Sequence, residues 1–159
     1  MDFLTSQIVA NICEIIIAFF TAFMALGIWY ARNSLEEQRK QVELQSWNMI
    51  FELWGREKEL RAREFVLKDF DFSQIDKLDS ARMHDVKMVL ATCNRISMFV
   101  LEGLIDDKKL ISFIGVSMLK IWEKTKDFIK WERQQNSKHY MYHFEKFIER
   151  YEKSIRKLG

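Results

Sequence analysis

Near its N-terminus the chain carries an overwhelmingly apolar run that covers residues 8–30 and is 23 residues long. A helix needs about 20 such residues to cross the hydrocarbon core of a bilayer. A cleaved signal peptide would instead begin with a basic segment and end at small residues. The seven residues that precede the run contain no Lys or Arg, and the run is longer than the apolar part of a signal peptide. The sequence therefore predicts a retained transmembrane helix within residues 1–31.

The residues that follow the run indicate how it lies in the membrane. Trp29 and Tyr30 close it, where an interfacial belt of aromatic side chains would lie. Arg32, Arg39 and Lys40 come next, and positively charged flanks favour the cytoplasmic side. We therefore expect a single-pass membrane protein, with its N-terminus outside and residues 32–159 forming a cytoplasmic domain.

One side of the predicted membrane helix is polar or small. Its residues recur every three or four positions, and we call them the polar stripe: Gln7, Asn11, Glu14, Ala18, Thr21 and Ala25. An ionisable side chain in lipid is costly, so Glu14 should face protein or water. Small residues let helices approach closely, and polar ones form hydrogen bonds between them. With one membrane helix per chain, the partner must be another copy, and the stripe predicts a homo-oligomer.

Three interpretations of the polar stripe stay open at this point. It can be a packed contact between subunits. Glu14, about two helical turns from the outer end, can extend its carboxylate to the outer interface. Alternatively, several copies can form a ring whose polar faces line a water-filled path, with Glu14 as an acidic ring.

The composition of the rest of the chain favours long helices. The sequence has no Pro and only five Gly, whereas strand-and-turn proteins need such punctuation. All 25 basic residues lie in residues 32–159, against 21 acidic ones, which is too mixed a charge to indicate nucleic-acid binding by itself. Cys13 lies in the apolar run and Cys93 in a predicted helix, so we expect no disulfide.

Periodicity and capping signals predict an all-α chain whose membrane helix continues into a helical bundle. Apolar and charged positions alternate with helical period over residues 31–68, where Gly55 is the only helix breaker. We then predict a loop with one helical turn over 69–79. A helix follows from a cap at Asp79 or Ser80 to about Glu102, with Gly103 just beyond its end. The next helix runs from Asp106 or Asp107 to about Arg133, and after a turn over 134–138 a last helix runs from His139 to Arg156.

The apolar positions of these helices predict one shared core. The predicted core residues are Val86, Val89, Leu90, Cys93, Ile96, Ser97 and Val100, then Ile111, Ile114, Met118, Ile121 and Trp122, and finally Phe144, Phe147, Ile148 and Tyr151. On the helix over 31–68, one face carries Trp47, Ile50, Phe51 and Trp54. Basic residues over 56–68 alternate with Glu57, Glu59 and Glu64, which is typical of a solvated helix face.

The best candidate for chemistry is an Arg and a His separated by five residues. Arg133 ends one predicted helix and His139 opens the next. Imidazole titrates near neutral pH, and guanidinium binds phosphate through two hydrogen bonds. The alternative is that Arg133 caps a helix and His139 is an ordinary first-turn residue. His139 and His143 have a spacing suited to a metal, but no third ligand is fixed nearby, so we predict no metal site.

The Arg133–His139 pattern is similar to the R-x4–6-H motif of HEPN domains, helical bundles that carry it at the start of their final helix. In active HEPN ribonucleases the His is a general acid or base at the RNA 2′-OH, and the Arg stabilises phosphate charge. Gln134 stands where active enzymes commonly have Asn, which weakens the case for catalysis. The layout of anchor, bundle and motif resembles the small membrane accessory proteins of type VI-B CRISPR systems, within a wider group of bacterial single-pass proteins.

That resemblance implies an oligomeric pore in the bacterial inner membrane, or a membrane-perturbing accessory protein, in antiviral defence alongside an RNA-guided ribonuclease. The expected partners are the lipid bilayer, further copies of the chain, and RNA or the ribonuclease. The alternative is a membrane-anchored HEPN-type ribonuclease that acts through Arg133 and His139. We predict no cofactor and no small-molecule substrate.

Overall fold

The computed structural model describes residues 2–157, with side chains from Glu14 onward. The described residues form helices and no strand, which confirms the all-α prediction. The chain divides into two compact units, Met1–Val42 and Glu43–Gly159, and each is described by itself.

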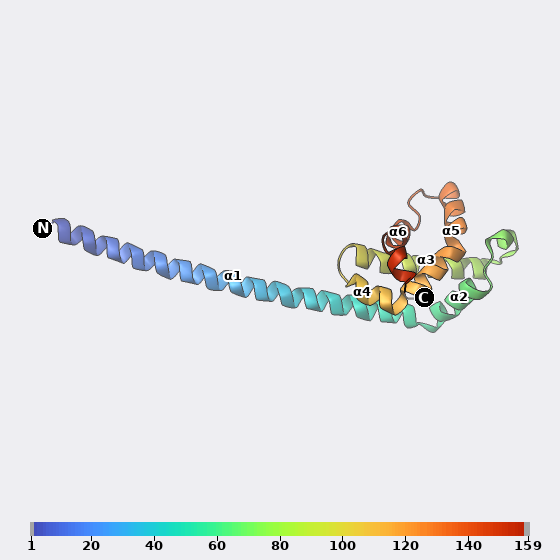
Figure 1. The fold of residues 1–159 in the computed structure, drawn as a ribbon, viewed down its shortest axis with the longest axis horizontal. Helices are drawn as coiled ribbons and strands as arrows, with labels where there is room; N and C mark the ends of the chain where they lie inside the picture. Colours follow the sequence, from blue (N-terminus) through green and yellow to red (C-terminus); the bar gives the residue numbers. More distant parts are fainter. Residues whose placement is uncertain (1, 158–159) are drawn as a thin grey trace. The chain divides into compact units, whose positions relative to one another are not determined.

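The first helix, α1, spans Asp2–Gly55 and appears in blue to teal in Figure 1. It is long and apolar enough to cross a membrane. In the first unit its large apolar side chains between Ile15 and Tyr30 are exposed by 49–73%. Soluble monomers rarely expose an apolar surface of this extent, so this segment requires apolar surroundings. As predicted, α1 continues without a break beyond residue 31.

The second unit contains the last turns of α1 and a bundle of shorter helices (Figure 1). These are α2 (Glu57–Lys68), the 3-10 helix η1 (Phe72–Lys77), α3 (Ser80–Leu101), α4 (Asp107–Leu110), the π-helix η2 (Ile111–Gly115), α5 (Val116–Gln135) and α6 (Tyr142–Ile155).

Local capping chemistry fixes several helix ends where the sequence predicted them. The Asp79 side chain accepts a hydrogen bond from the Arg82 amide and begins α3. Asp106 does the same for the Lys109 amide at the start of α4. Gly103, just beyond α3, has a φ of +70°, a conformation that favours glycine.

The core of the bundle gathers around α3, which packs against α2 and α6. Every predicted core residue of α3 is buried, as are the predicted residues of α6. On the helix before α6, Trp122 is only partly buried, while the other predicted residues are in the core. On the α1 face that carries four large apolar residues, Ile50 is fully buried, Trp47 and Trp54 are partly buried, and Phe51 is 51% exposed.

The start of the last helix and the geometry of the helix before it differ from the prediction. The last helix begins at Tyr142 and not at His139, because Met141 adopts a left-handed backbone with φ 56° and ψ 34°. The helix that starts at Asp107 continues to Gln135 but contains the π-turn η2 in its path. Gly115 closes that turn, and a Cβ there would lie 3.3 Å from side-chain atoms of both Ile111 and Ile155.

Candidate functional site

The side chain of Arg133 joins the end of α5 to the loop and helix that follow. Its Nε donates to the Tyr140 carbonyl at 2.9 Å, and its Nη1 lies 2.9 Å from the Glu145 carboxylate on α6. The Arg133 and Glu145 side chains are only 20% and 28% exposed. Arg133 therefore stabilises the loop geometry through half-buried, charge-assisted bonds.

His139 lies in the same loop but has different neighbours. Its residue is exposed, its amide donates weakly to the Ser137 hydroxyl at 3.4 Å, and its ring meets Tyr142 edge-on at 6.3 Å. Among the described residues no hydrogen bond or ion pair joins His139 to Arg133, and no three potential ligands converge on a metal position. Within the chain the two candidate residues are thus brought to one helix–loop junction but not into contact.

A buried acid lies directly before Arg133, and the sequence analysis did not identify it. Glu132 is 2% exposed and its carboxylate lies 2.5 Å from Lys87 Nζ on α3. The Asn136 amide, at the start of the loop, donates to the same carboxylate. Nearby, the Tyr140 hydroxyl is buried without a hydrogen-bond partner, and burial, followed by the Glu132 charge, raises the pKa of Tyr140.

The loop also borders a shallow pocket on α3. The Asn94 side chain accepts a hydrogen bond from the Phe144 amide at 3.1 Å, and so caps α6 from a neighbouring helix. The pocket has a volume of about 380 Å³ and is lined by Ala91, Asn94, Arg95, Met98, Tyr140 and Met141.

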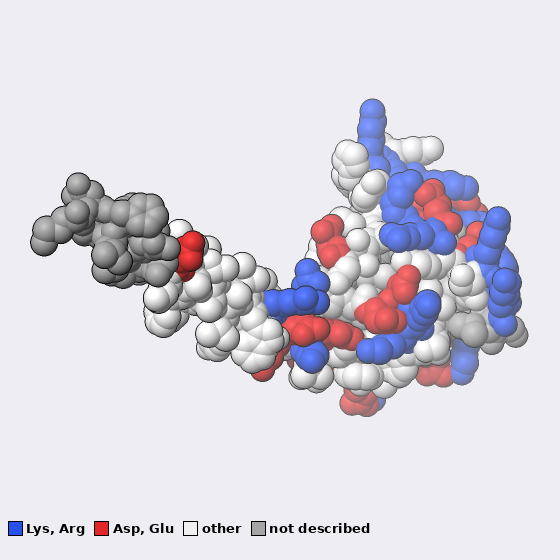
Figure 2. Space-filling model, turned by 60° about the vertical axis from the view of Figure 1, so that its left-hand side comes forward, with Lys and Arg blue, Asp and Glu red and all other residues white. Residues whose placement is uncertain are grey.

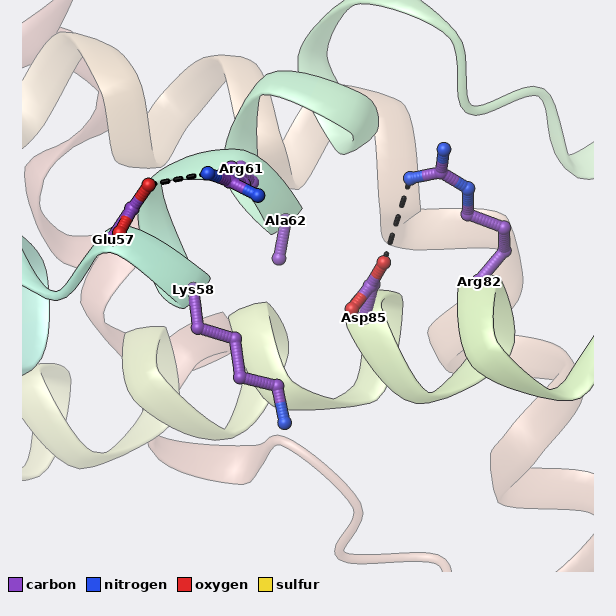
Figure 3. A pocket seen from close by; sticks show the side chains of 6 residues that line it. All are labelled: Glu57, Lys58, Arg61, Ala62, Arg82 and Asp85. Carbon is purple, nitrogen blue, oxygen red and sulfur yellow. Dashed lines mark hydrogen bonds and ion pairs between the residues drawn. The ribbon is translucent and has the colours of Figure 1, made fainter.

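A second pocket, of about 440 Å³, lies between α2 and α3 (Figure 3). Its polar lining is largely self-neutralised, since Arg61 pairs with Glu57 and Arg82 lies 3.6 Å from Asp85. Lys58, drawn in Figure 3 with its ammonium in the open space, has no ion-pair partner among the described residues. This surface offers one unpaired charge, which is a weak basis for binding an anion.

The basic stretch of residues 56–68 is only partly the solvated face that the sequence predicted. Arg61 and Lys68 are exposed and pair with acids four residues earlier. Arg63, in contrast, is 6% exposed and Glu59 is 7% exposed. The prediction is wrong for these two residues, because their side chains turn inward at the junction of α1 and α2.

The polar stripe can be followed only in part. Gln7 and Asn11 precede the residues whose side chains are described. Glu14, Ala18, Thr21 and Ala25 are exposed, and the Thr21 hydroxyl donates to the Ile17 carbonyl at 2.8 Å. Apart from one acidic patch, the described part of the apolar segment is uncharged in Figure 2, whereas acidic and basic side chains intermingle on the bundle.

Comparison with known proteins gives one finding. A family described as "Domain of unknown function (DUF4760)" matches residues 8–151. No curated protein and no solved structure matches the chain. The matched region takes in both the apolar helix and the bundle up to α6, and the chain belongs to the DUF4760 family.

Proposed function

We propose that this chain is a membrane-anchored protein whose copies associate through the polar stripe and open a path across the bilayer. The observation that supports this most is the apolar segment of α1, whose large side chains are exposed around a line of small and polar residues. Lipid satisfies the apolar faces, and sister helices satisfy the remaining face.

The cost of placing an acid in the bilayer supports self-association. A lone carboxylate costs about 2.5–3.5 kcal/mol at the centre of a membrane helix on insertion scales, and less at the depth of Glu14, about two turns from the outer end. In a ring of subunits Glu14 faces its counterparts across water, and that cost falls. The family match begins at residue 8, so one family model covers both the apolar helix and the bundle.

The biological role that we propose follows from this activity. Charge that moves through an open path dissipates the membrane potential, which stores about 2.3 kcal/mol per elementary charge per 100 mV. Loss of the potential arrests a cell. The resemblance to accessory proteins of type VI-B CRISPR systems supports a place in antiviral defence, and we propose that role for this chain.

The first experiment measures the mass of the detergent-extracted particle by light scattering. We expect an oligomer for the wild type and a shift towards monomer for Ala18→Leu, because a large side chain in the stripe keeps helices apart. Ile17→Leu, one position off the stripe, is the matched control and should keep the wild-type mass. A wild-type particle that is monomeric in a lipid nanodisc would contradict the proposal.

The second experiment measures ion flux through liposomes that contain the protein. Glu14→Gln should reduce the preference for cations over anions, since it removes the acidic ring. Glu37→Gln, on α1 but off the stripe, should leave the selectivity unchanged. Equal selectivity and equal mass in the wild type and Glu14→Gln would exclude a role of this carboxylate in the path.

In this proposal Arg133 and His139 position the α5–α6 loop or sense a nucleotide or RNA at a subunit contact. The ribonuclease alternative makes a different prediction for His139→Ala. If the wild type cleaves RNA and the variant does not, while particle mass and ion flux are unchanged, the ribonuclease alternative is supported over the pore.

A further inference from the structure

The corner between α1 and α2 is a single residue wide. α1 ends at Gly55, Arg56 has an extended backbone with φ −60° and ψ 136°, and α2 begins at Glu57 without a side-chain cap. The last carbonyl groups of a helix have no partner within the helix, so a turn of this kind leaves acceptors that another group must satisfy.

Arg63 supplies that group. Its Nη2 donates to the Trp54 carbonyl at 2.5 Å, in the last turn of α1. Its guanidinium carbon lies 3.9 Å from the centre of the Trp54 ring, an arrangement that adds a cation–π attraction. Arg63 thus holds the end of α1 onto α2 by both the main chain and the side chain of one residue.

The position of Arg63 departs from a pattern that its neighbours follow. Acidic and basic residues four positions apart pair along this stretch: Glu52 with Arg56, Glu57 with Arg61 and Glu64 with Lys68. Glu59 and Arg63 have the same spacing on the same helix, yet no ion pair joins them among the described residues. The contact with Trp54 has drawn the guanidinium away from its local partner.

Both members of this unformed pair are left incompletely satisfied. The Oε2 atom of Glu59 and the Nη1 atom of Arg63 are buried and have no hydrogen-bond partner. Burial also lowers the pKa of Arg63, against the opposing influence of Cys93 and Glu59. Glu59 and Arg63 lie one helical turn apart. If they formed the missing i,i+4 ion pair, both the unpaired acceptor and the unpaired donor would gain a partner.

We propose that Arg63 is a latch with two positions, closed on Trp54 and open on Glu59, and that it sets how firmly the end of α1 is held to the bundle. In the closed position the Trp54 carbonyl is capped and Glu59 is unsatisfied. In the open position Glu59 and Arg63 pair, and the corner at Gly55 and Arg56 is released.

Through the latch the bundle can change how firmly the end of α1 is held, and α1 is the helix that carries the apolar segment. Any event that stabilises the Glu59–Arg63 pair loosens α1, and any event that draws Arg63 back to Trp54 tightens it. This inference does not depend on a pore, because it concerns contacts within the second unit alone.

Hydrogen exchange followed by mass spectrometry tests the latch on the full chain in detergent. The readout is the exchange rate of peptides that cover residues 52–60, with peptides from 86–100 of α3 as an internal measure of global unfolding. Neutralising the two members should have opposite effects. Glu59→Gln should slow exchange at the corner several-fold, because the competing partner is weakened, and Arg63→Gln should accelerate it at least tenfold.

The controls are the neighbouring pairs. Glu64→Gln and Arg61→Gln remove the same charges from exposed pairs on α2 and should leave exchange at the corner unchanged. If Arg63→Gln fails to fold, Arg63→Lys keeps the charge but loses the planar stacking on Trp54, and should accelerate exchange at residues 52–60 alone. The latch is excluded if Glu59→Gln leaves the corner unchanged or accelerates its exchange, or if an Arg63 variant speeds α3 and the corner equally.

Discussion

At the residue scale, Asn94 illustrates a role that only the folded chain reveals. Met141, the residue before α6, has no side-chain oxygen and is left-handed, so α6 has no cap of its own. The Asn94 side chain, 50 positions earlier, accepts from the Phe144 amide instead. Capping from a neighbouring helix ties the start of α6 to α3 and so orders the loop that carries His139.

We predict that Asn94→Ala destabilises the chain by about 1 kcal/mol, the usual cost of a lost helix cap. Denaturant unfolding followed by circular dichroism measures this change. Asn48→Ala, at an exposed position of α1, should change the unfolding free energy by less than about 0.5 kcal/mol. Equal effects of the two substitutions would show that the cap has no energetic role.

Cys93 is the second case at this scale, because its environment sets its chemistry. The thiol is fully buried, and burial raises its pKa from 9.0 to about 12, with Arg63 acting in the opposite direction. Between pH 9 and 12 the unfolded chain releases this proton while the folded chain keeps it. The contribution of the Cys93 thiol to the free energy of unfolding is therefore fully present below pH 9 and declines as the pH rises towards 12.

In a Cys13→Ser background, Cys93 should react with a thiol reagent at pH 8 only after denaturant is added, because the thiolate is the nucleophile. The time course of labelling, with and without denaturant, provides the measurement. Rapid labelling of the folded chain would contradict the burial of this residue.

Residues whose partners lie on another helix or in a folded loop are the ones that the sequence could not reveal. Glu132 and Arg63 have the spacing and charge of surface residues, and their burial depends on Lys87 and Trp54, respectively. Arg133 and His139 were correctly assigned to one junction, because that assignment needs only local sequence. Their separate contacts could not be predicted, since these depend on Tyr140 in the folded loop and on Tyr142 and Glu145 in the first turn of α6.

At the scale of the elements, α3 and α5 are joined by a partly buried ion pair. Glu132 on α5 is almost fully enclosed, whereas its partner Lys87 on α3 keeps 44% of its side chain exposed. The cost of burying the Glu132 carboxylate is offset by the Lys87 ammonium and by the hydrogen bond from the Asn136 amide.

We predict that Lys87→Met destabilises the bundle by about 2 kcal/mol, because it leaves a buried carboxylate without its cation. Lys130→Met is the matched control, since Lys130 pairs with Asp127 at the surface, and should cost less than about 0.5 kcal/mol. Thermal unfolding of both variants measures the difference, and Glu132→Gln combined with Lys87→Met should recover part of the loss.

Helix ends with their own chemical signals were predicted well. Asp79, Gly103 and Asp106 mark boundaries through side chains or backbone freedom that are readable in the sequence. The start of α6 was wrong by three residues, because a methionine in a left-handed conformation has no such signal. The π-turn was also missed, since apolar spacing that fits an α-helix fits a slightly wider turn as well.

At the scale of the whole molecule, the core belongs to one unit. The buried hydrophobic cluster runs from Ile50 to Ile155 and includes none of residues 14–42, the part of the first unit whose side chains are described. We therefore predict that a fragment of residues 43–159 folds without detergent and unfolds cooperatively, whereas the full chain requires detergent. Circular dichroism melts of the two proteins test this, and a fragment that aggregates or melts without a transition would contradict it.

The π-turn at Ile111–Gly115 has a consequence for chain length. A turn of this kind holds one more residue than the α-helical turn that it replaces, so it absorbs an extra residue while Leu110 and Met118 on either side stay in the core. Members of the family that are one residue shorter here should have an ordinary helix with the same inward faces. The same deletion within α3 would rotate half of its core face into water.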